Sequence, residues 1–400
     1  MIGAGEAMAA AQPRVVAALA ARFRDLDLAE EAFAEACAAA LPVWRAEPPR
    51  DATAWLWRAA FRKALDMRRR EQTRRSAVLD APAPEPTPED ELMALDEPIP
   101  DERLRLIFVC CHPAIAPESR AALTLKVVCG LSTERLARAF LMAEPAMLQR
   151  ITRAKRKIRD AGVPFEVPGR AAWPERLSAV LATLEIAYAQ AYEDAALAGE
   201  TAGFADEVLR LSGLLAELTP DEPEVLALAA LVRYAEARRP ARLDDHGAMV
   251  PIGRQDMSQW RRPMIYEGLE LLNRAASFGR TGPCQLLAAI HGAHLSRLET
   301  GTTPWPAIVD LYDTLVLLRP GPVTAVNRAV AVGEAQGPEA GLAALPPPMD
   351  WLPWHAARAH LLEQAGHVPE ALEALRAALA MEPPPAERLF LQRAAERLAG

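Results

Sequence analysis

Apolar residues recur at helical spacing through most of the chain. In the stretch LDLAEEAFAEACAAAL, Leu28, Ala32, Phe33, Ala36 and Ala39–Ala40 fall on one side of a helix, and the glutamates fall elsewhere. Runs rich in Val, Ile and Thr are scarce, so a large sheet is not expected. Four hundred residues also exceed what one hydrophobic core normally holds. The sequence predicts an all-α fold with two or three domains.

The first predicted domain covers residues 10–75 and ends in a strongly cationic helix, AWLWRAAFRKALDMRRREQTRR. Its cations are Arg62, Lys63, Arg68, Arg69, Arg70, Arg74 and Arg75, and only Asp66 and Glu71 oppose them. The aromatic residues Trp55, Trp57 and Phe61 lie among these cations. Aromatic rings beside cations suit unstacked, single-stranded bases. The competing interpretation is that the rings belong to the domain core.

Residues 76–102 interrupt the helical pattern. The stretch VLDAPAPEPTPEDELMALDEPIPDE is rich in proline and acidic residues and holds no basic residue. Proline favours extended conformations and like charges repel, so we expect a flexible acidic linker.

The second predicted domain covers residues 103–162 and ends in LSTERLARAFLMAEPAMLQRITRAKRKIRDAG. A helix begins at Pro117 and ends at Gly130, and Ser132 or Thr133 caps the next helix. LMAEP is a short turn, and Pro145 is a good first residue for the helix that follows. In that helix an apolar stripe consists of Met147, Ile151, Ala154 and Ile158. The pattern predicts a helix-turn-helix.

Polar and cationic residues occupy the rest of this last helix. Gln149, Arg150 and Arg153 are near enough to its start to reach base edges in a major groove, where Arg pairs with guanine and Gln with adenine. Later cations are better placed for phosphates; they are Lys155, Arg156, Lys157 and Arg159. The alternative is a surface helix with solvated charges. The turn and the stripe favour double-stranded DNA as the ligand.

The remainder of the chain reads as helices after a short linker, VPFEVPGR. We expect a helical extension over residues 171–282, with a loop at ARRPARLDDHGAMVPIGRQDMSQW and a short hairpin at His246–Gly247. Residues 283–400 hold a faint repeat, in which GPEAGLAAL echoes VPEALEALRAAL. Small residues at tetratricopeptide-like positions of the second copy are Ala359, Ala371 and Ala378, with a closing Pro383. Helical hairpins of the tetratricopeptide kind are therefore predicted.

Charge and candidate chemistry narrow the function classes. The net charge is −8, no apolar run is long enough to cross a bilayer, and the N-terminus lacks the pattern of a secretory signal. We expect a cytoplasmic protein without a membrane partner, whose five cysteines stay free. His291 and His294 lack a third ligand at metal-site spacing, and Cys110, Cys111 and His112 lie in an apolar run. The sequence contains no complete dinucleotide-binding or phosphate-binding motif, so no cofactor, metal or catalytic residue is predicted.

The order of these parts resembles the extracytoplasmic-function sigma factors of bacterial RNA polymerase. Residues 14–75 look like their region 2 and residues 103–162 like their region 4. The chain is most similar to the subgroup with a long C-terminal tetratricopeptide-like extension. Segments that carry this likeness are PDEPEVLALAALV, ARRPARLDDHGAMVPIGRQDMSQW and AVNRAV at Ala325 to Val330.

The resemblance implies a protein that directs core RNA polymerase to promoters, with region 4 on duplex DNA and region 2 beside the melted strand. In region 2 it implies DNA contacts by Trp57, Arg62, Lys63, Arg69 and Arg70. It implies polymerase contacts on the helix that holds Glu30, Glu31 and Ala34. The family pattern has Asp and Gln where this chain has Glu31 and Ala34. The extension resembles a built-in regulator.

Two other classes compete with this interpretation. A one-component helix-turn-helix regulator with a helical sensor would not need the basic, aromatic helix that precedes the linker. A scaffold of helical repeats would leave the helix-turn-helix spacing unexplained.

Overall fold

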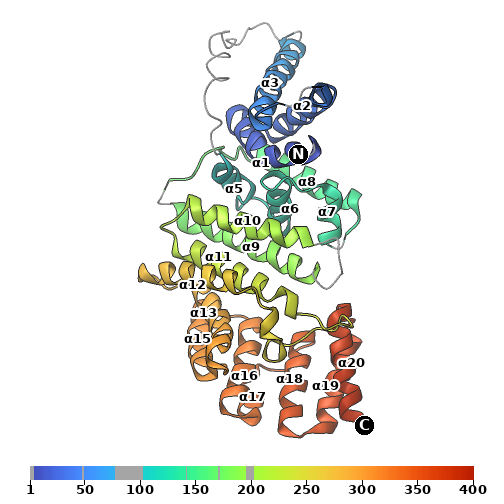
Figure 1. The fold of residues 1–400 in the computed structure, drawn as a ribbon, viewed down its shortest axis with the longest axis vertical. Coiled ribbons are helices and arrows are strands. Elements are labelled where there is room, and N and C mark those ends of the chain that lie inside the picture. Colours follow the sequence, from blue (N-terminus) through green and yellow to red (C-terminus); the bar gives the residue numbers. More distant parts are fainter. Residues whose placement is uncertain (1–3, 47–48, 77–101, 141, 170–171, 195–201) are drawn as a thin grey trace. The chain divides into compact units, whose positions relative to one another are not determined.

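The structure is a computed structural model, and it describes residues 4–46, 49–76, 102–140, 142–169, 172–194 and 202–400. Over these ranges the protein is helical and holds no β-strand, which confirms the predicted all-α class (Figure 1). The predicted linker at residues 76–102 lies almost wholly outside the described residues. Two compact units form, Met1–Ala187 and Tyr188–Gly400, and the division falls inside a helix, α9 (Trp173–Asp194).

The N-terminal unit begins with three mutually packed helices, α1 (Ala4–Phe23), α2 (Leu26–Ala46) and α3 (Ala52–Ser76). The predicted face of α2 is largely confirmed, because Ala32, Phe33, Ala36 and Ala40 are buried. Ala39 is exposed instead. Buried apolar residues of the three helices thus form the first core of this unit.

The other described helices of the N-terminal unit are α5 (Arg103–Cys110), α6 (Pro117–Val127), α7 (Thr133–Ala139), α8 (Glu144–Asp160) and the first part of α9. Helix α1 packs on α5 and α6, so the two predicted N-terminal domains share one compact unit. Gly130 separates α6 from α7 with φ 74°, a left-handed conformation that glycine adopts without steric cost. Arg176 on α9 donates to the carbonyl of Phe108 at 2.6 Å.

The C-terminal unit is a series of helices, most of which pack on their neighbours in sequence, as α11, α12 and α13 do. Its α-helices are α10 (Ala202–Leu218), α11 (Pro223–Ala237), α12 (Arg262–Ser277), α13 (Pro283–Leu295), α14 (Arg297–Thr300), α15 (Trp305–Leu318), α16 (Pro322–Gln336), α17 (Pro338–Ala344), α18 (Leu352–Ala365), α19 (Val368–Ala380) and α20 (Pro385–Ala399). Short 3-10 turns fill the segment between α11 and α12.

A tight turn stands where the sequence predicts a hairpin. Leu243 and Met249 form an isolated antiparallel bridge, and Gly247 turns the chain with φ 80°. The Asp244 carboxylate accepts hydrogen bonds from the backbone N–H groups of His246 and Ala248, both at 2.9 Å. The predicted hairpin is therefore confirmed only as a turn closed by a single bridge, without strands on either side.

Proline opens most helices of the C-terminal unit. It occupies the first or second position of α11, α12, α13, α15, α16, α17, α18, α19 and α20, and at none of these starts does the side chain of the N-cap residue itself cap the helix. The backbone N–H that proline lacks would find no partner at a helix start, so this position suits the residue.

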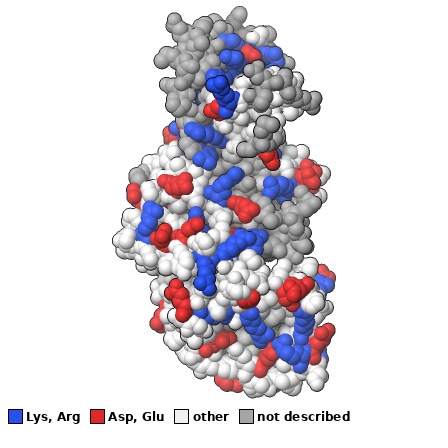
Figure 2. All heavy atoms as spheres, in the orientation of Figure 1, with Lys and Arg blue, Asp and Glu red and all other residues white. Residues whose placement is uncertain are grey.

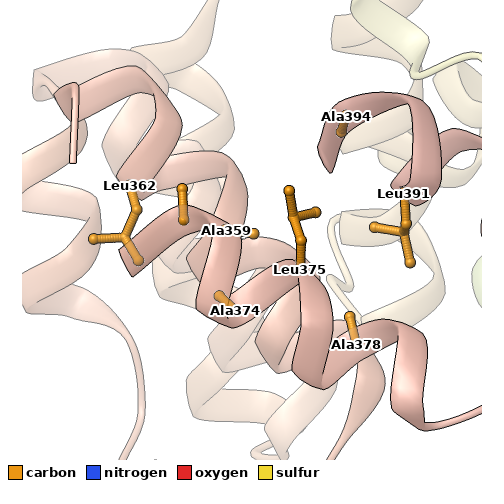
Figure 3. Close-up of a cluster of buried hydrophobic side chains, with 8 residues drawn as sticks. Ala359, Leu362, Ala374, Leu375, Ala378, Leu391 and Ala394 are labelled. Carbon is orange, nitrogen blue, oxygen red and sulfur yellow. The ribbon is translucent and has the colours of Figure 1, made fainter. Parts of the chain in front are cut away.

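The last three helices enclose a small core (Figure 3). Leu362 of α18, Leu375 of α19 and Leu391 of α20 contribute its large side chains. Alanines fill the remaining positions: Ala359, Ala371, Ala374, Ala378 and Ala394. Three of these are the small residues that the repeat pattern singled out, so the predicted helical packing is confirmed at these positions.

Candidate nucleic-acid interface

Helices α7 and α8 are joined by a turn that the backbone holds closed. The N–H of Phe140 donates to the carbonyl of Leu136, and the N–H of Met142 donates to that of Ala137, both at 2.9 Å. The hydroxyl of Ser132 accepts from the N–H of Arg135 at 3.2 Å, which confirms its predicted capping role.

The apolar stripe of α8 is confirmed completely. Its buried residues are Met147, Ile151, Ala154 and Ile158, and the helix packs with them against α6 and α7. Burial of this stripe leaves most of the remaining helix surface to polar and cationic residues, although Leu148 is exposed as well.

Most of the residues predicted to contact DNA on α8 lie at its surface. Gln149, Arg153, Arg156 and Lys157 are exposed, and Arg150 is partly exposed. The Nε of Arg153 donates to the backbone carbonyl of Gln149 at 3.3 Å. These side chains can meet an anionic ligand without movement of the helix.

Lys155 is the exception among these cations, because it lies against α2. Its side chain is 13% exposed and its ammonium group bonds to Asp27, at 2.9 Å, and to Glu30. Arg159 reaches the other carboxylate oxygen of Asp27 at 3.2 Å. These four residues are the α2–α8 ion-pair cluster. Burial lowers the pKa of Lys155, but the two carboxylates outweigh burial and the pKa is raised.

The start of α2 fixes the acidic half of this cluster. The Asp25 carboxylate accepts from the N–H groups of Asp27 and Leu28, at 2.9 and 3.1 Å, and so caps the helix. A cleft of about 350 Å³ opens beside the cluster, and Arg24 and Phe165 are among the residues that line it.

Helix α3 presents its predicted DNA-contacting cations unevenly. Arg62, Arg69 and Arg70 are exposed. Lys63 is half-exposed and forms an ion pair with Glu35 of α2 at 3.1 Å.

The role predicted for Trp57 requires correction. Its side chain is only 6% exposed and its ring packs against Phe61, with centroids 5.4 Å apart. Phe61 also packs against Phe23 of α1. A ring enclosed in the bundle core is not presented to a base, so the core interpretation applies to Trp57 and Phe61.

The three residues predicted to contact polymerase share α2 but differ in environment. Glu31 and Ala34 are exposed. Glu30 is 20% exposed and engaged by Lys155. Asp27, which the sequence analysis did not select, joins Glu30 in holding this cation. Its only sequence signal was its place in the first turn of a helix, where acidic residues are common.

A group of buried polar residues in the C-terminal unit was also missed by sequence reasoning. Glu236 is buried and holds Arg239 through two hydrogen bonds of 2.6 Å. The buried Arg238 lies 3.3 Å from Nδ1 of His291. Burial, followed by the charge of Arg238, lowers the pKa of His291 well below its usual value and that of His294 to about 4. Glu236 and Arg239 have the i, i+3 spacing of a helical ion pair, which was the available signal.

Other candidate chemistry is sparse in the described part of the chain. All five cysteines are free, and Cys110 and Cys111 are buried, which raises the pKa of both thiols.

Over the described ranges, no group of three or more His, Cys, Asp and Glu side chains could hold a metal ion. None of the described helices combines the length and apolar character that a bilayer crossing requires.

Figure 2 shows Lys and Arg side chains interspersed with Asp and Glu on the visible face. The acidic net charge of −8 is therefore compatible with local cationic surfaces such as that of α8.

Together these observations define an all-helical protein in which a short helix and a turn are followed by an exposed cationic helix. Residues 176–276 match a family of unknown function, DUF6596. The chain is 40% identical to uncharacterized protein R00370 of Rhizobium meliloti (strain 1021), over 98% of this chain and 95% of the relative. The chain belongs to the same family as that protein. No solved structure matches this chain.

Proposed function

We propose that this protein is a sigma factor of the extracytoplasmic-function type, which brings core RNA polymerase to specific promoters. In this proposal α8 reads duplex DNA and the cationic end of α3 lies beside the melted strand. The protein supplies recognition, and the polymerase carries out the chemistry.

One observation carries the proposal: helix α8 buries an apolar stripe and keeps its polar residues outward. A helix that reads a major groove must be held from behind and leave its outer face free. The buried Met147 and Ile151 meet the first condition, and the exposed Gln149 and Arg153 meet the second. Arg and Gln are residue types that pair with base edges, which supports sequence-specific recognition.

The second support is the cationic helix in the same unit. Arg62, Arg69 and Arg70 are exposed on α3, where they can neutralise phosphates and release counterions. A one-component regulator has no need of this surface. Without Trp57, contact with the melted strand depends on these cations.

The test mixes the purified full-length protein with core polymerase that lacks any sigma factor and scores transcripts from a genomic promoter library. We expect discrete, promoter-specific transcripts that disappear when the protein is omitted. DNA binding without transcripts would favour a one-component regulator instead. A protein that binds neither DNA nor polymerase would fit a helical scaffold.

The proposal extends to the C-terminal helices, which we take to be a built-in regulator. Arrays of helices offer extended binding surfaces. In this proposal the C-terminal helices take the place of a separate regulatory protein. Truncation after residue 170 would remove the first part of α9, where Arg176 bonds to Phe108. A better test inserts a protease site among residues 195–201 and cleaves the folded protein. Transcript output should change on cleavage, whereas a scrambled, uncleavable site should leave it constant. Equal output in both would contradict the regulatory role.

A further inference from the structure

The α2–α8 ion-pair cluster joins a helix proposed to read DNA to a helix proposed to contact polymerase. The partners are far apart in sequence, since Lys155 and Asp27 are separated by 128 positions. Lys155 has three N–H donors, and carboxylates of Asp27 and Glu30 take two of them. Its side chain is 13% exposed and that of Glu30 is 20% exposed, so the contact is shielded from solvent.

We propose that the acidic face of α2 formed by Asp27 and Glu30 is a docking surface for α8 of the same chain, and that duplex DNA competes with it for Lys155 and Arg159. This inference rests on the proposed function, because it takes α8 as the DNA-reading helix.

Because of charge, Lys155 can bind either the carboxylates of α2 or a DNA phosphate, but not both at once. A phosphate that approached the docked ammonium group would also approach two carboxylates, whose negative charge repels it. Arg153, Arg156 and Lys157 carry no such restriction, because they are exposed. DNA therefore engages these side chains first, and Lys155 and Arg159 transfer from α2 to phosphates afterwards.

The exchange has a consequence for Glu30, which the family resemblance assigns to polymerase binding. As long as Lys155 bonds to it, this carboxylate is neutralised and largely covered. DNA binding frees Glu30, so DNA and polymerase favour each other's binding. Linkage requires the coupling to be reciprocal.

A zero-length carbodiimide cross-link on the full-length protein reports docking directly, because it joins an amine only to a carboxylate in contact with it. Peptide mass spectrometry should find Lys155 joined to Asp27 or Glu30. It should also find Lys63 joined to Glu35, an ion pair of 3.1 Å within the α1–α3 bundle that serves as internal control. Saturating duplex DNA should suppress the first cross-link and leave the second.

A matched pair of variants measures the competition without polymerase. Glu30→Gln should raise affinity for duplex DNA about two- to fivefold at low salt, the range expected for loss of one shielded ion pair. Glu118→Gln removes the same charge at an exposed position at the start of α6 and should bind as the natural protein does.

Each outcome decides a different claim. Absence of the Lys155 cross-link, with the Lys63 cross-link present, overturns docking. Persistence of the Lys155 cross-link in protein that fluorescence anisotropy shows to be fully DNA-bound overturns the competition. Failure to bind any DNA, with the cross-link intact, overturns the proposed function and the DNA competition but leaves the docking contact established.

Discussion

Gly333 and Gly341 face each other where α16 packs on α17. A Cβ atom at Gly341 would lie 2.7 Å from the Cα of Gly333 and 2.7 Å from a methyl carbon of Leu361. At such distances a side chain and a backbone cannot coexist, so the two helices approach closely only because both residues are glycine.

We therefore expect Gly341→Ala to lower the free energy of unfolding by about 1–3 kcal/mol, as overpacking does elsewhere. Gly213→Ala is the matched control, because it lies in α10 and its Cβ would meet only the end of the Arg233 side chain, at 3.4 Å. Alanine favours a helix, so this control should be neutral or stabilising. Urea denaturation would measure both, and equal midpoints would contradict the close approach.

Acid should destabilise the C-terminal unit through His294. In the unfolded chain a histidine has a pKa near 6.5, whereas burial, with Arg238 and Arg297 nearby, lowers the pKa of folded His294 to about 4. Below pH 6.5 the unfolded state binds a proton that the folded state does not, so stability is complete above this pH and falls as pH decreases towards 4. The loss should be about 2 kcal/mol, after allowance for partial exposure.

Denaturation at several pH values would measure this slope. His294→Phe keeps an aromatic ring next to Trp305, whose centroid lies 5.1 Å away, and removes the titrating group. The slope between pH 7 and pH 5 should become shallower. His246→Asn, at an exposed turn, controls for substitution of a histidine as such. A slope that His294→Phe leaves intact would show that other groups cause the acid sensitivity.

Glu224 should contribute to stability by capping α13 from a neighbouring helix. Its carboxylate accepts from the N–H of Cys284 at 2.8 Å and from that of Gln285 at 3.1 Å. Substitution by Ala leaves these donors without their partner, and we expect a loss of about 1–3 kcal/mol. Thermal unfolding would show it. The comparison is Glu217→Ala, at an exposed position of α10, and a similar midpoint for both would contradict the capping role.

Two substitutions on α8 should separate base reading from phosphate contact. Arg153→Ala should cost about 1–3 kcal/mol of discrimination between promoter sequences if this side chain pairs with a base. Lys157→Ala should weaken binding evenly across sequences and reduce the slope of affinity against salt by about one. Fluorescence anisotropy with matched and scrambled duplexes would measure both. Sequence-independent losses from both variants would remove Arg153 from base reading.

Sequence alone predicted the features that depend on neighbouring positions. The α8 stripe from Met147 to Ile158 repeats at helical spacing, so its burial could be derived without knowledge of its partners. The same holds for Ala371 and Ala378 on α19.

Features that join distant segments could not be derived in this way. No local pattern connects Lys155 with Asp27, since their contact depends on how α2 and α8 pack. The prediction for Trp57 was wrong for another reason. Trp57 lies four positions before Phe61, which is the spacing of one helix face, whereas the cations beside it favoured base stacking. Periodicity was the better guide to its environment.

The prolines that open successive helices of the C-terminal unit have one more consequence. Their fixed φ angle sets each helix start through the backbone itself, whereas many helices rely on a serine, threonine or aspartate side chain. The N-cap residue that precedes such a proline can therefore vary in polarity where its side chain is exposed, as at His367, so a family can alter the surface at these helix junctions without shifting the register of the array.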